Sequence, residues 1–179
     1  MKSIILVAIS LLMVATNANA QSVESVLAAA PARARTGAAV IKWNDDYTYE
    51  TLKEGTNRIV CYDRSGERDR QPFAVQCTSK MNLDRVAQNR RFRVETEDAA
   101  GERAMIDAAE QAGTRVQPEY NSIWFRMDGA DQASALLHAT IAMPGATTES
   151  TGLSDNRRTG GVWLMDTGTS AAHLMIPGR

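Results

Sequence analysis

Apolar and polar residues alternate, or group into short apolar runs bounded by turn residues, over most of the chain after residue 37, and this pattern predicts β-strands. The predicted strands cover residues 38–43, 47–52, 58–62, 73–77, 123–129, 137–143, 162–165 and 172–176. We expect the first three of them to form a hairpin or a short meander. The polar residues 146–161 between later strands predict a long loop.

A charged, proline-free stretch over residues 81–113 lacks this alternation and predicts two helices with a break near residues 95–97. Thr96 is the expected N-cap of the second helix, and Gly113 is its expected end. The order of strands, helices and strands predicts an α+β fold. In this fold a mainly antiparallel sheet has two central helices inserted between its strand groups.

Residues 1–20 have the pattern of a cleaved signal peptide. Lys2 is followed by the apolar run 4–14, and the small-x-small sequence of residues 18–20 predicts cleavage before Gln21. As a helix the apolar run is about 16 Å long, roughly half of a bilayer core, which argues against a membrane anchor. We therefore expect a periplasmic or secreted protein with no integral membrane segment after signal cleavage.

The mature chain is expected to consist of a lead-in and one domain. The alanine-rich residues 21–37, interrupted by Pro31, predict a short helix or a flexible lead-in outside the core, and residues 38–179 predict a single α+β domain. The composition, 44% hydrophobic and 23% charged, suffices for one soluble domain with a core. The small negative net charge of -1 attracts neither nucleic acid nor anionic lipid, so we expect no nucleic-acid partner.

The two cysteines, Cys61 and Cys77, are expected to form a disulfide. Export places them in an oxidising compartment, which favours pairing. Their spacing differs from the C-x-x-C spacing of redox-active pairs. The loop that they close is charged and rich in turn formers, so burial alone cannot hold it in place.

The two histidines of the chain, His138 and His173, are candidate binding residues. Strand alternation directs both away from the more aliphatic face of their strands, so the rings lie on one surface if the strands share a sheet. We expect no cofactor. As an alternative, imidazole and thioether ligands in an exported protein suggest copper held by His138, His173 and Met175.

Two further groups of polar residues are candidate binding sites. In the turn over residues 54–57, Gly55 permits close backbone approach, which makes Glu54 and Asn57 candidate binding residues, although an ordinary surface turn explains them too. The densest basic run consists of Arg85, Arg90, Arg91 and Arg93. Acidic residues follow it, so it predicts a solvated helix face more than an anion or nucleic-acid site.

The sequence of residues 166–170, Asp-Thr-Gly-Thr-Ser, also occurs around the catalytic aspartate of pepsin-like proteases. That fold requires several further strands after the aspartate, and only 13 residues follow Asp166 here. The segment therefore predicts a hairpin loop in which polar side chains bond to nearby backbone. For acid–base chemistry the candidates are Glu54, His138 and His173. The sequence does not assign a catalytic role to any of them.

Several short motifs together resemble a group of small exported bacterial proteins with no established activity. The shared motifs are the L-x-E-G-T-N turn of residues 52–57, Cys61, the pair Gly160–Gly161, the pair Gly168–Thr169 and the A-H-L-M-x-P segment of residues 171–177. The group has a Pro/Asp-rich loop between its cysteines, whereas the loop here is shorter and rich in arginine. The resemblance implies an exported disulfide-containing domain and no reaction.

From these patterns we expect an exported soluble protein that acts as a binding or accessory module. Its partner is a protein or a small molecule that the sequence does not identify. The alternative is an enzyme or a copper-binding protein that uses the face carrying His138 and His173.

Overall fold

A computed structural model describes residues 22–176, and the predicted signal peptide, residues 1–20, lies outside them. Within the described residues, eight strands form one sheet in the order β2-β1-β3-β4-β5-β6-β8-β7. The strands are β1 (Ala39–Trp43), β2 (Tyr49–Lys53), β3 (Ile59–Asp63), β4 (Phe73–Ser79), β5 (Ile123–Gly129), β6 (Leu136–Ala142), β7 (Trp163–Met165) and β8 (His173–Met175). Every pair is antiparallel except β1 with β3. The α+β fold with a mainly antiparallel sheet is confirmed.

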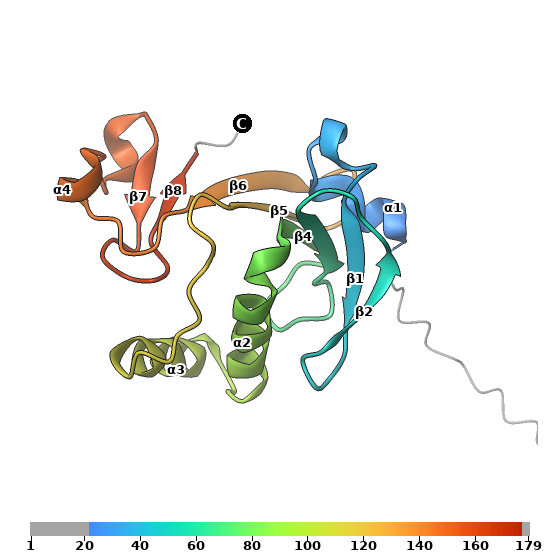
Figure 1. Cartoon of the computed structure of the whole chain (residues 1–179), viewed down its shortest axis with the longest axis horizontal. Helices are drawn as coiled ribbons and strands as arrows, with labels where there is room; N and C mark the ends of the chain where they lie inside the picture. Colours follow the sequence, from blue (N-terminus) through green and yellow to red (C-terminus); the bar gives the residue numbers. More distant parts are fainter. Residues whose placement is uncertain (1–21, 177–179) are drawn as a thin grey trace, which may run out of the picture.

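Two longer helices lie between β4 and β5 in the sequence, as expected. The helices are α1 (Val23–Val26), α2 (Leu83–Val94), α3 (Ala99–Gln111) and α4 (Thr148–Thr151), and the short 3-10 helices are η1 (Leu27–Ala29), η2 (Ala32–Ala34), η3 (Lys80–Asn82) and η4 (Arg157–Thr159). Figure 1 shows α2 and α3 together on one side of the sheet. The polar segment 146–161, predicted as a loop, contains α4 and η4.

The placement of β3 differs from the predicted meander. β2 returns antiparallel to β1, but β3 pairs parallel with the opposite edge of β1. The turn between β2 and β3 explains the crossing, because the backbone N–H groups of Thr56 and Asn57 donate to the carbonyl of Gly37 at 2.8 and 2.9 Å. The chain therefore passes the start of β1 and continues on its other side.

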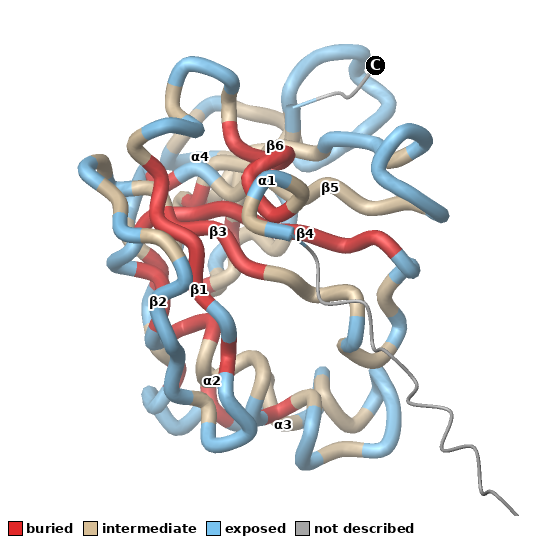
Figure 2. The backbone as a smooth tube through the Cα atoms, turned by 90° about the vertical axis from the view of Figure 1, so that its right-hand side faces the viewer, coloured by how far each residue is buried: buried red, intermediate tan, exposed pale blue. Residues whose placement is uncertain are grey.

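The two faces of the sheet carry different cores. On one face, Val40, Cys61, Val75 and Cys77 pack against residues 26–30 of α1 and η1. The expectation that residues 21–37 lie outside the core was wrong for this part, since residues 26–30 are all buried. The run of small apolar residues fits closely against the strands, which alanine-rich composition alone did not indicate. Figure 2 shows the continuous buried backbone through β1, β3 and β4.

On the other face, α2 packs over the middle strands. Leu83 and Val86 of α2 contact Ile41, Val60 and Tyr62 of the sheet. The break after α2 lies where it was expected. The N-cap of α3 is Asp98, whose carboxylate accepts from the N–H of Gly101 at 2.8 Å. Thr96, the predicted cap, instead donates its hydroxyl to the carbonyl of Phe92 at 2.7 Å.

The predicted end of α3 and the predicted hairpin loop are both present. Gly113 follows α3 with φ of 69°, a left-handed conformation that glycine adopts without strain. Residues 166–170 connect β7 to β8, and the hydroxyl of Thr169 donates to the carbonyl of Asp166 at 2.7 Å.

Cys61 and Cys77 face each other in register across β3 and β4, with their sulfur atoms 2.11 Å apart. The predicted disulfide is confirmed, and both residues are fully buried. The disulfide closes the loop between β3 and β4 at its base.

In the part of the chain that the structure describes, no helix combines the length and the apolar run needed to cross a bilayer.

Candidate functional site

A cavity of about 280 Å³ lies between α2, the polar half of the sheet and the β7–β8 connection, and we call it the arginine-lined cavity. Strand alternation places the side chains of Tyr62, Gln76, Trp124 and His173 on the face of the sheet that α2 covers. The charged residues that line the cavity are Arg64, Glu67, Arg70, Arg85, Arg90, Arg93 and Asp166. Five guanidinium groups therefore face two carboxylates.

Glu67, in the loop that the disulfide closes, organises one wall of this cavity. Its Oε2 atom accepts from Nε and Nη2 of Arg64 at 2.9 and 2.7 Å and from Nη1 of Arg93 at 2.6 Å. Its Oε1 atom accepts from Arg90. Burial alone raises the pKa of Glu67, but the charges of these three guanidinium groups outweigh it and lower the pKa below the ordinary value. The carboxylate is thus ionised, and both of its oxygens already accept hydrogen bonds from arginines.

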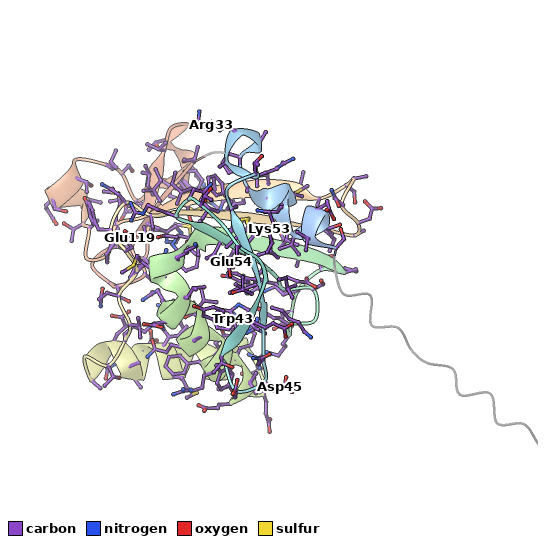
Figure 3. All side chains as sticks on the ribbon, turned by 45° about the vertical axis from the view of Figure 1, so that its right-hand side comes forward. Arg33, Trp43, Asp45, Lys53, Glu54 and Glu119 are labelled. Carbon is purple, nitrogen blue, oxygen red and sulfur yellow. A yellow bond between two sulfur atoms is a disulfide. The ribbon has the colours of Figure 1, made fainter. Side chains whose placement is uncertain are left out.

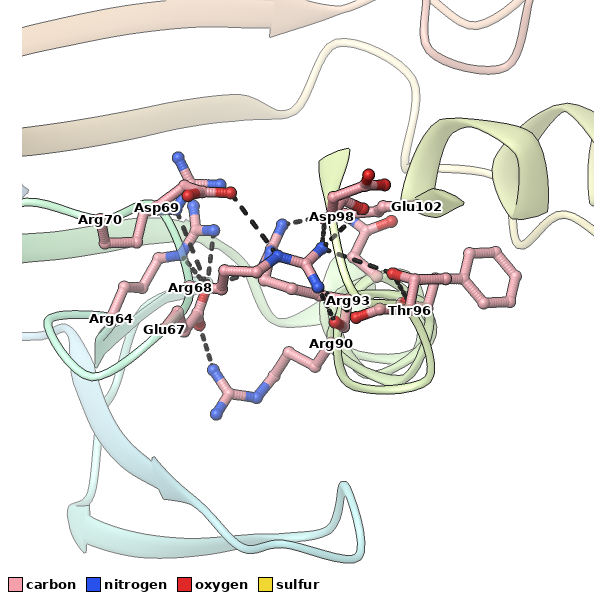
Figure 4. A network of polar contacts seen from close by, with 12 residues as sticks. Arg64, Glu67, Arg68, Asp69, Arg70, Arg90, Arg93, Thr96, Asp98 and Glu102 are labelled. Atoms are coloured by element: carbon pink, nitrogen blue, oxygen red, sulfur yellow. Dashed lines mark hydrogen bonds and ion pairs between the residues drawn. The ribbon is translucent and has the colours of Figure 1, made fainter. Parts of the chain in front are cut away.

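A second set of contacts fixes this wall to the helices (Figure 4). Arg93 also donates to Glu102 of α3 at 2.9 Å. Arg68 donates to the same carboxylate at 3.1 Å and to the backbone carbonyl of Arg93 at 2.7 Å. The loop between β3 and β4, the end of α2 and the start of α3 are therefore held together by one network of charge-assisted hydrogen bonds.

Arg70 lines the cavity without a hydrogen-bond partner. Within the described residues its guanidinium makes no hydrogen bond, and its Nε atom lies 3.9 Å from Oε2 of Glu67. Burial, together with the charges of Arg64 and Arg93, lowers the pKa of Arg70 to about 10, so the group stays charged at neutral pH. A cation whose neighbours are mainly cations gains strongly from a bound anion.

Tyr62 contributes a second unsatisfied polar group to the same wall. Its side chain is 1% exposed, and its hydroxyl makes no hydrogen bond to any described residue. Burial raises its pKa, so the hydroxyl keeps its proton and remains a donor. A buried hydroxyl without a partner costs about 1–3 kcal/mol, a cost that a ligand oxygen removes.

Arg85 and Ser170 connect the cavity to α3. Nη1 of Arg85 donates to the hydroxyl of Ser170 at 3.0 Å, and that hydroxyl donates to Glu110. The same nitrogen donates to the carbonyl of Val116. Burial and the charge of Arg115 lower the pKa of Arg85 to about 10.

The sheet brings the two histidines to one face, as alternation predicts, but to different surroundings. His173 lines the arginine-lined cavity. His138 stands opposite Arg126 in the ladder between β5 and β6 and lines a separate hollow. Burial lowers the pKa of His138, and the charges of Arg126 and His173 lower it further.

Met175 shares this face with both histidines. However, residues 22–176 contain no group of three or more His, Cys, Asp or Glu side chains placed to hold a metal ion. The guanidinium opposite His138 opposes the approach of a metal cation. The surroundings of His138 therefore suit an anion better than a cation.

The structure places Glu54 and Asn57 far from the histidines. Five strands, β1 and β3 to β6, separate β2 from β8 in the sheet. Asn57 uses its amide within the fold, since Nδ2 donates to the carbonyl of Ala34 at 2.9 Å and Oδ1 accepts from the N–H of Ile59 at 2.9 Å. Glu54 is exposed beside Lys53 at the end of β2 (Figure 3). This turn joins parts of the fold and does not reach the arginine-lined cavity.

The expectation of a solvated basic helix face was wrong for three of its four arginines. Arg85 is buried, and Arg90 and Arg93 line the cavity, whereas Arg91 is exposed. The carboxylates that pair with Arg90 and Arg93 are Glu67, from the loop between the cysteines, and Glu102 of α3. A signal was present in the sequence, since that loop carries Arg64, Arg68 and Arg70, but spacing alone does not show that the two basic segments meet.

No protein family, curated protein or solved structure matches the chain.

Proposed function

We propose that this protein is an exported binding module that holds a small organic oxyanion in the arginine-lined cavity. The observation that carries the proposal is Arg70, a half-buried guanidinium without a hydrogen bond among the described residues, which lies in a cavity with surplus positive charge. Arginine binds carboxylate, phosphate and sulfate groups through paired N–H donors. The unpartnered hydroxyl of Tyr62 on the same wall supports this.

Export is part of the proposal, and two features support it. The pattern of residues 1–20 is that of a signal peptide. The buried disulfide between Cys61 and Cys77 is typical of proteins in an oxidising compartment. A periplasmic or secreted location is consistent with a role in capturing a ligand outside the cytoplasm.

The size of the cavity limits the ligand. Pockets for drug-sized molecules measure about 300–1,000 Å³, and this one, at about 280 Å³, lies below that range. It suits a metabolite of a few carbon atoms that carries a phosphate, sulfate or carboxylate group. Trp124 on the floor of the cavity offers an apolar surface beside the charges.

The test compares Arg70→Gln with Arg103→Gln. Both remove one positive charge, but Arg103 is exposed on α3 and forms a surface ion pair with Asp107. The full chain is expressed with its N-terminal segment, and the intact mass of the recovered protein reports signal removal and disulfide formation. Thermal unfolding is then followed with increasing inorganic phosphate at constant ionic strength, because a ligand that binds the folded state raises the melting temperature.

We expect phosphate to stabilise the wild type and Arg103→Gln, and to bind Arg70→Gln about tenfold or more weakly, as loss of a hydrogen bond to a charged group implies. Without phosphate, Arg70→Gln should be at least as stable as the wild type, because it removes a crowded cation that makes no hydrogen bond. Equal affinity of the two variants would overturn the assignment of the site. So would the absence of any phosphate effect on the wild type.

A further inference from the structure

The free polar atoms of the arginine-lined cavity differ between its two ends, and this difference defines a ligand class. We infer that the ligand is bifunctional: an oxyanion group at the end formed by Tyr62, Arg70 and Gln76, and an ammonium or hydroxyl donor at the end formed by Asp166 and His173. The inference rests on the proposed function and specifies the ligand of that same site.

One end presents mainly donors, because an arginine occupies the acceptor atom of its amide. Oε1 of Gln76 accepts from Nη1 of Arg64 at 2.6 Å. A guanidinium cannot accept a hydrogen bond, so this contact fixes which way the amide points and leaves its NH2 group available. Within the described residues, this NH2 group makes no hydrogen bond.

The remaining groups at this end are donors as well. Arg70 has an uncommitted guanidinium, and the buried hydroxyl of Tyr62 has no partner among residues 22–176. Both oxygens of the Glu67 carboxylate already accept hydrogen bonds from arginines, so the uncommitted groups at this end are mainly donors. An oxyanion, which carries only acceptor atoms, matches these donors.

The other end carries two acceptors near Arg85, whose Nη1 atom is already bound to Ser170. The carboxylate of Asp166 lines the cavity and makes no hydrogen bond or ion pair within residues 22–176. Nδ1 of His173 lies 2.7 Å from the carbonyl of Ala171, which can only accept, so Nδ1 carries the proton. In the neutral ring Nε2 is therefore an acceptor. A carboxylate and a basic nitrogen together match an ammonium or hydroxyl group of a ligand.

The strand order separates the two ends within one cavity. Tyr62 lies on β3 and His173 on β8, with β4, β5 and β6 between them. Asp166 follows β7 and has φ of 51°. Asparagine adopts this left-handed conformation readily, so Asp166→Asn removes the charge and keeps the backbone geometry.

The experiment measures the affinity of the wild type for two matched series by calorimetry. One series is butyl, hexyl and octyl phosphate, and the other is the same three compounds with a terminal amine. Chains of this length are used because three strand spacings, about 14 Å, separate Gln76 on β4 from His173 on β8. We expect at least one amine to bind about tenfold more tightly than the alkyl phosphate of the same length, as a charge-assisted hydrogen bond implies.

Asp166→Asn distinguishes a direct contact from a structural effect. Without its carboxylate, the amine should bind more weakly while the alkyl phosphate, freed from repulsion, binds more tightly, so the preference falls to about one. A purely structural role would weaken both in proportion. Asp155→Asn, the same charge change at an exposed residue, should keep the preference of the wild type.

Each remaining outcome contradicts one of the two proposals. If the alkyl phosphates bind but no amine is preferred, or if the preference survives in Asp166→Asn, the bifunctional ligand is wrong and the oxyanion site remains. If neither series nor inorganic phosphate binds the wild type, the oxyanion site itself is wrong.

Discussion

A single carboxylate, that of Glu67, determines how the charged groups of the cavity are arranged. Its side chain is 8% exposed, and it accepts hydrogen bonds from three arginines of two different segments. Because its two oxygens are used by Arg64, Arg90 and Arg93, the neighbouring Arg70 has none to bind. The guanidinium that we assign to ligand binding thus lacks a hydrogen bond among the described residues because cations outnumber this one anion.

We expect Glu67→Gln to destabilise the fold by about 3–5 kcal/mol, since it leaves buried guanidinium groups without their counter-ion. It should also change the pH dependence of stability. The folded state lowers the pKa of Glu67 below 4.5, so its stabilisation is complete above that pH and is lost as the pH falls through the lowered value. Urea unfolding from neutral to acid pH measures both effects. A variant that keeps the acid-dependent loss of the wild type would contradict this account.

The charged residues also show where sequence reasoning reached its limit. The basic run of α2 was visible in the sequence, but its local neighbours predicted a solvated face. Arg90 and Arg93 are desolvated because a loop some 25 residues earlier supplies Glu67. Tyr62 was part of a predicted strand, yet nothing in a strand pattern shows that its hydroxyl ends without a partner. Both features depend on contacts between segments that are far apart in the chain. A single sequence does not show which of its segments are in contact.

At the scale of elements, the turn between β2 and β3 is a junction that requires glycine. A Cβ atom on Gly55 would lie 2.4 Å from the backbone nitrogen of Ala39 and 2.8 Å from the carbonyl carbon of Ala38. These atoms belong to backbone and cannot move aside as a side chain does. The sequence predicted that backbone or a ligand approaches Gly55 closely. The structure shows such an approach, but the group that approaches is the backbone at the start of β1 and not a ligand.

We therefore expect Gly55→Ala to destabilise the protein by about 1–3 kcal/mol or more, the cost of forcing atoms into a packed site. Gly66→Ala is the matched control, because a Cβ atom there meets nothing within 4 Å. Chemical denaturation of both variants provides the comparison. Equal stability of the two would show that the junction tolerates a side chain and that the turn packs less closely than described.

The elements themselves were largely predictable, whereas their connections were less so. Each of the eight strands and both central helices corresponds to a predicted segment, because alternation and turn residues are local signals. The parallel pairing of β3 with β1 was not predicted, since it depends on hydrogen bonds from residues 56 and 57 back to Gly37. The observed N-cap of α3 is Asp98 and not the predicted Thr96. Both residue types favour the N-cap position, so the sequence alone does not distinguish them.

At the scale of the whole molecule, the sheet separates two environments. One face is apolar and carries the disulfide, and it is covered by residues 26–30 of α1 and η1. The other face carries the arginine-lined cavity under α2. Side chains of one strand alternate between these faces. Cys61 therefore contributes to the apolar core, whereas its neighbour Tyr62 lines the arginine-lined cavity.

This separation predicts that stability and ligand binding can be changed independently. Leu27→Ala removes a buried side chain from the apolar face and should cost about 2–5 kcal/mol of unfolding free energy. The control Leu136→Ala alters a side chain that is 69% exposed and should have little effect on stability. In Leu27→Ala the added stabilisation by phosphate should keep the size it has in the wild type, because distant sites contribute additively. Thermal and chemical unfolding with and without phosphate test both parts. If Leu27→Ala also lost the phosphate effect, the apolar face would be coupled to the arginine-lined cavity, and the sheet would transmit changes from one face to the other instead of separating them.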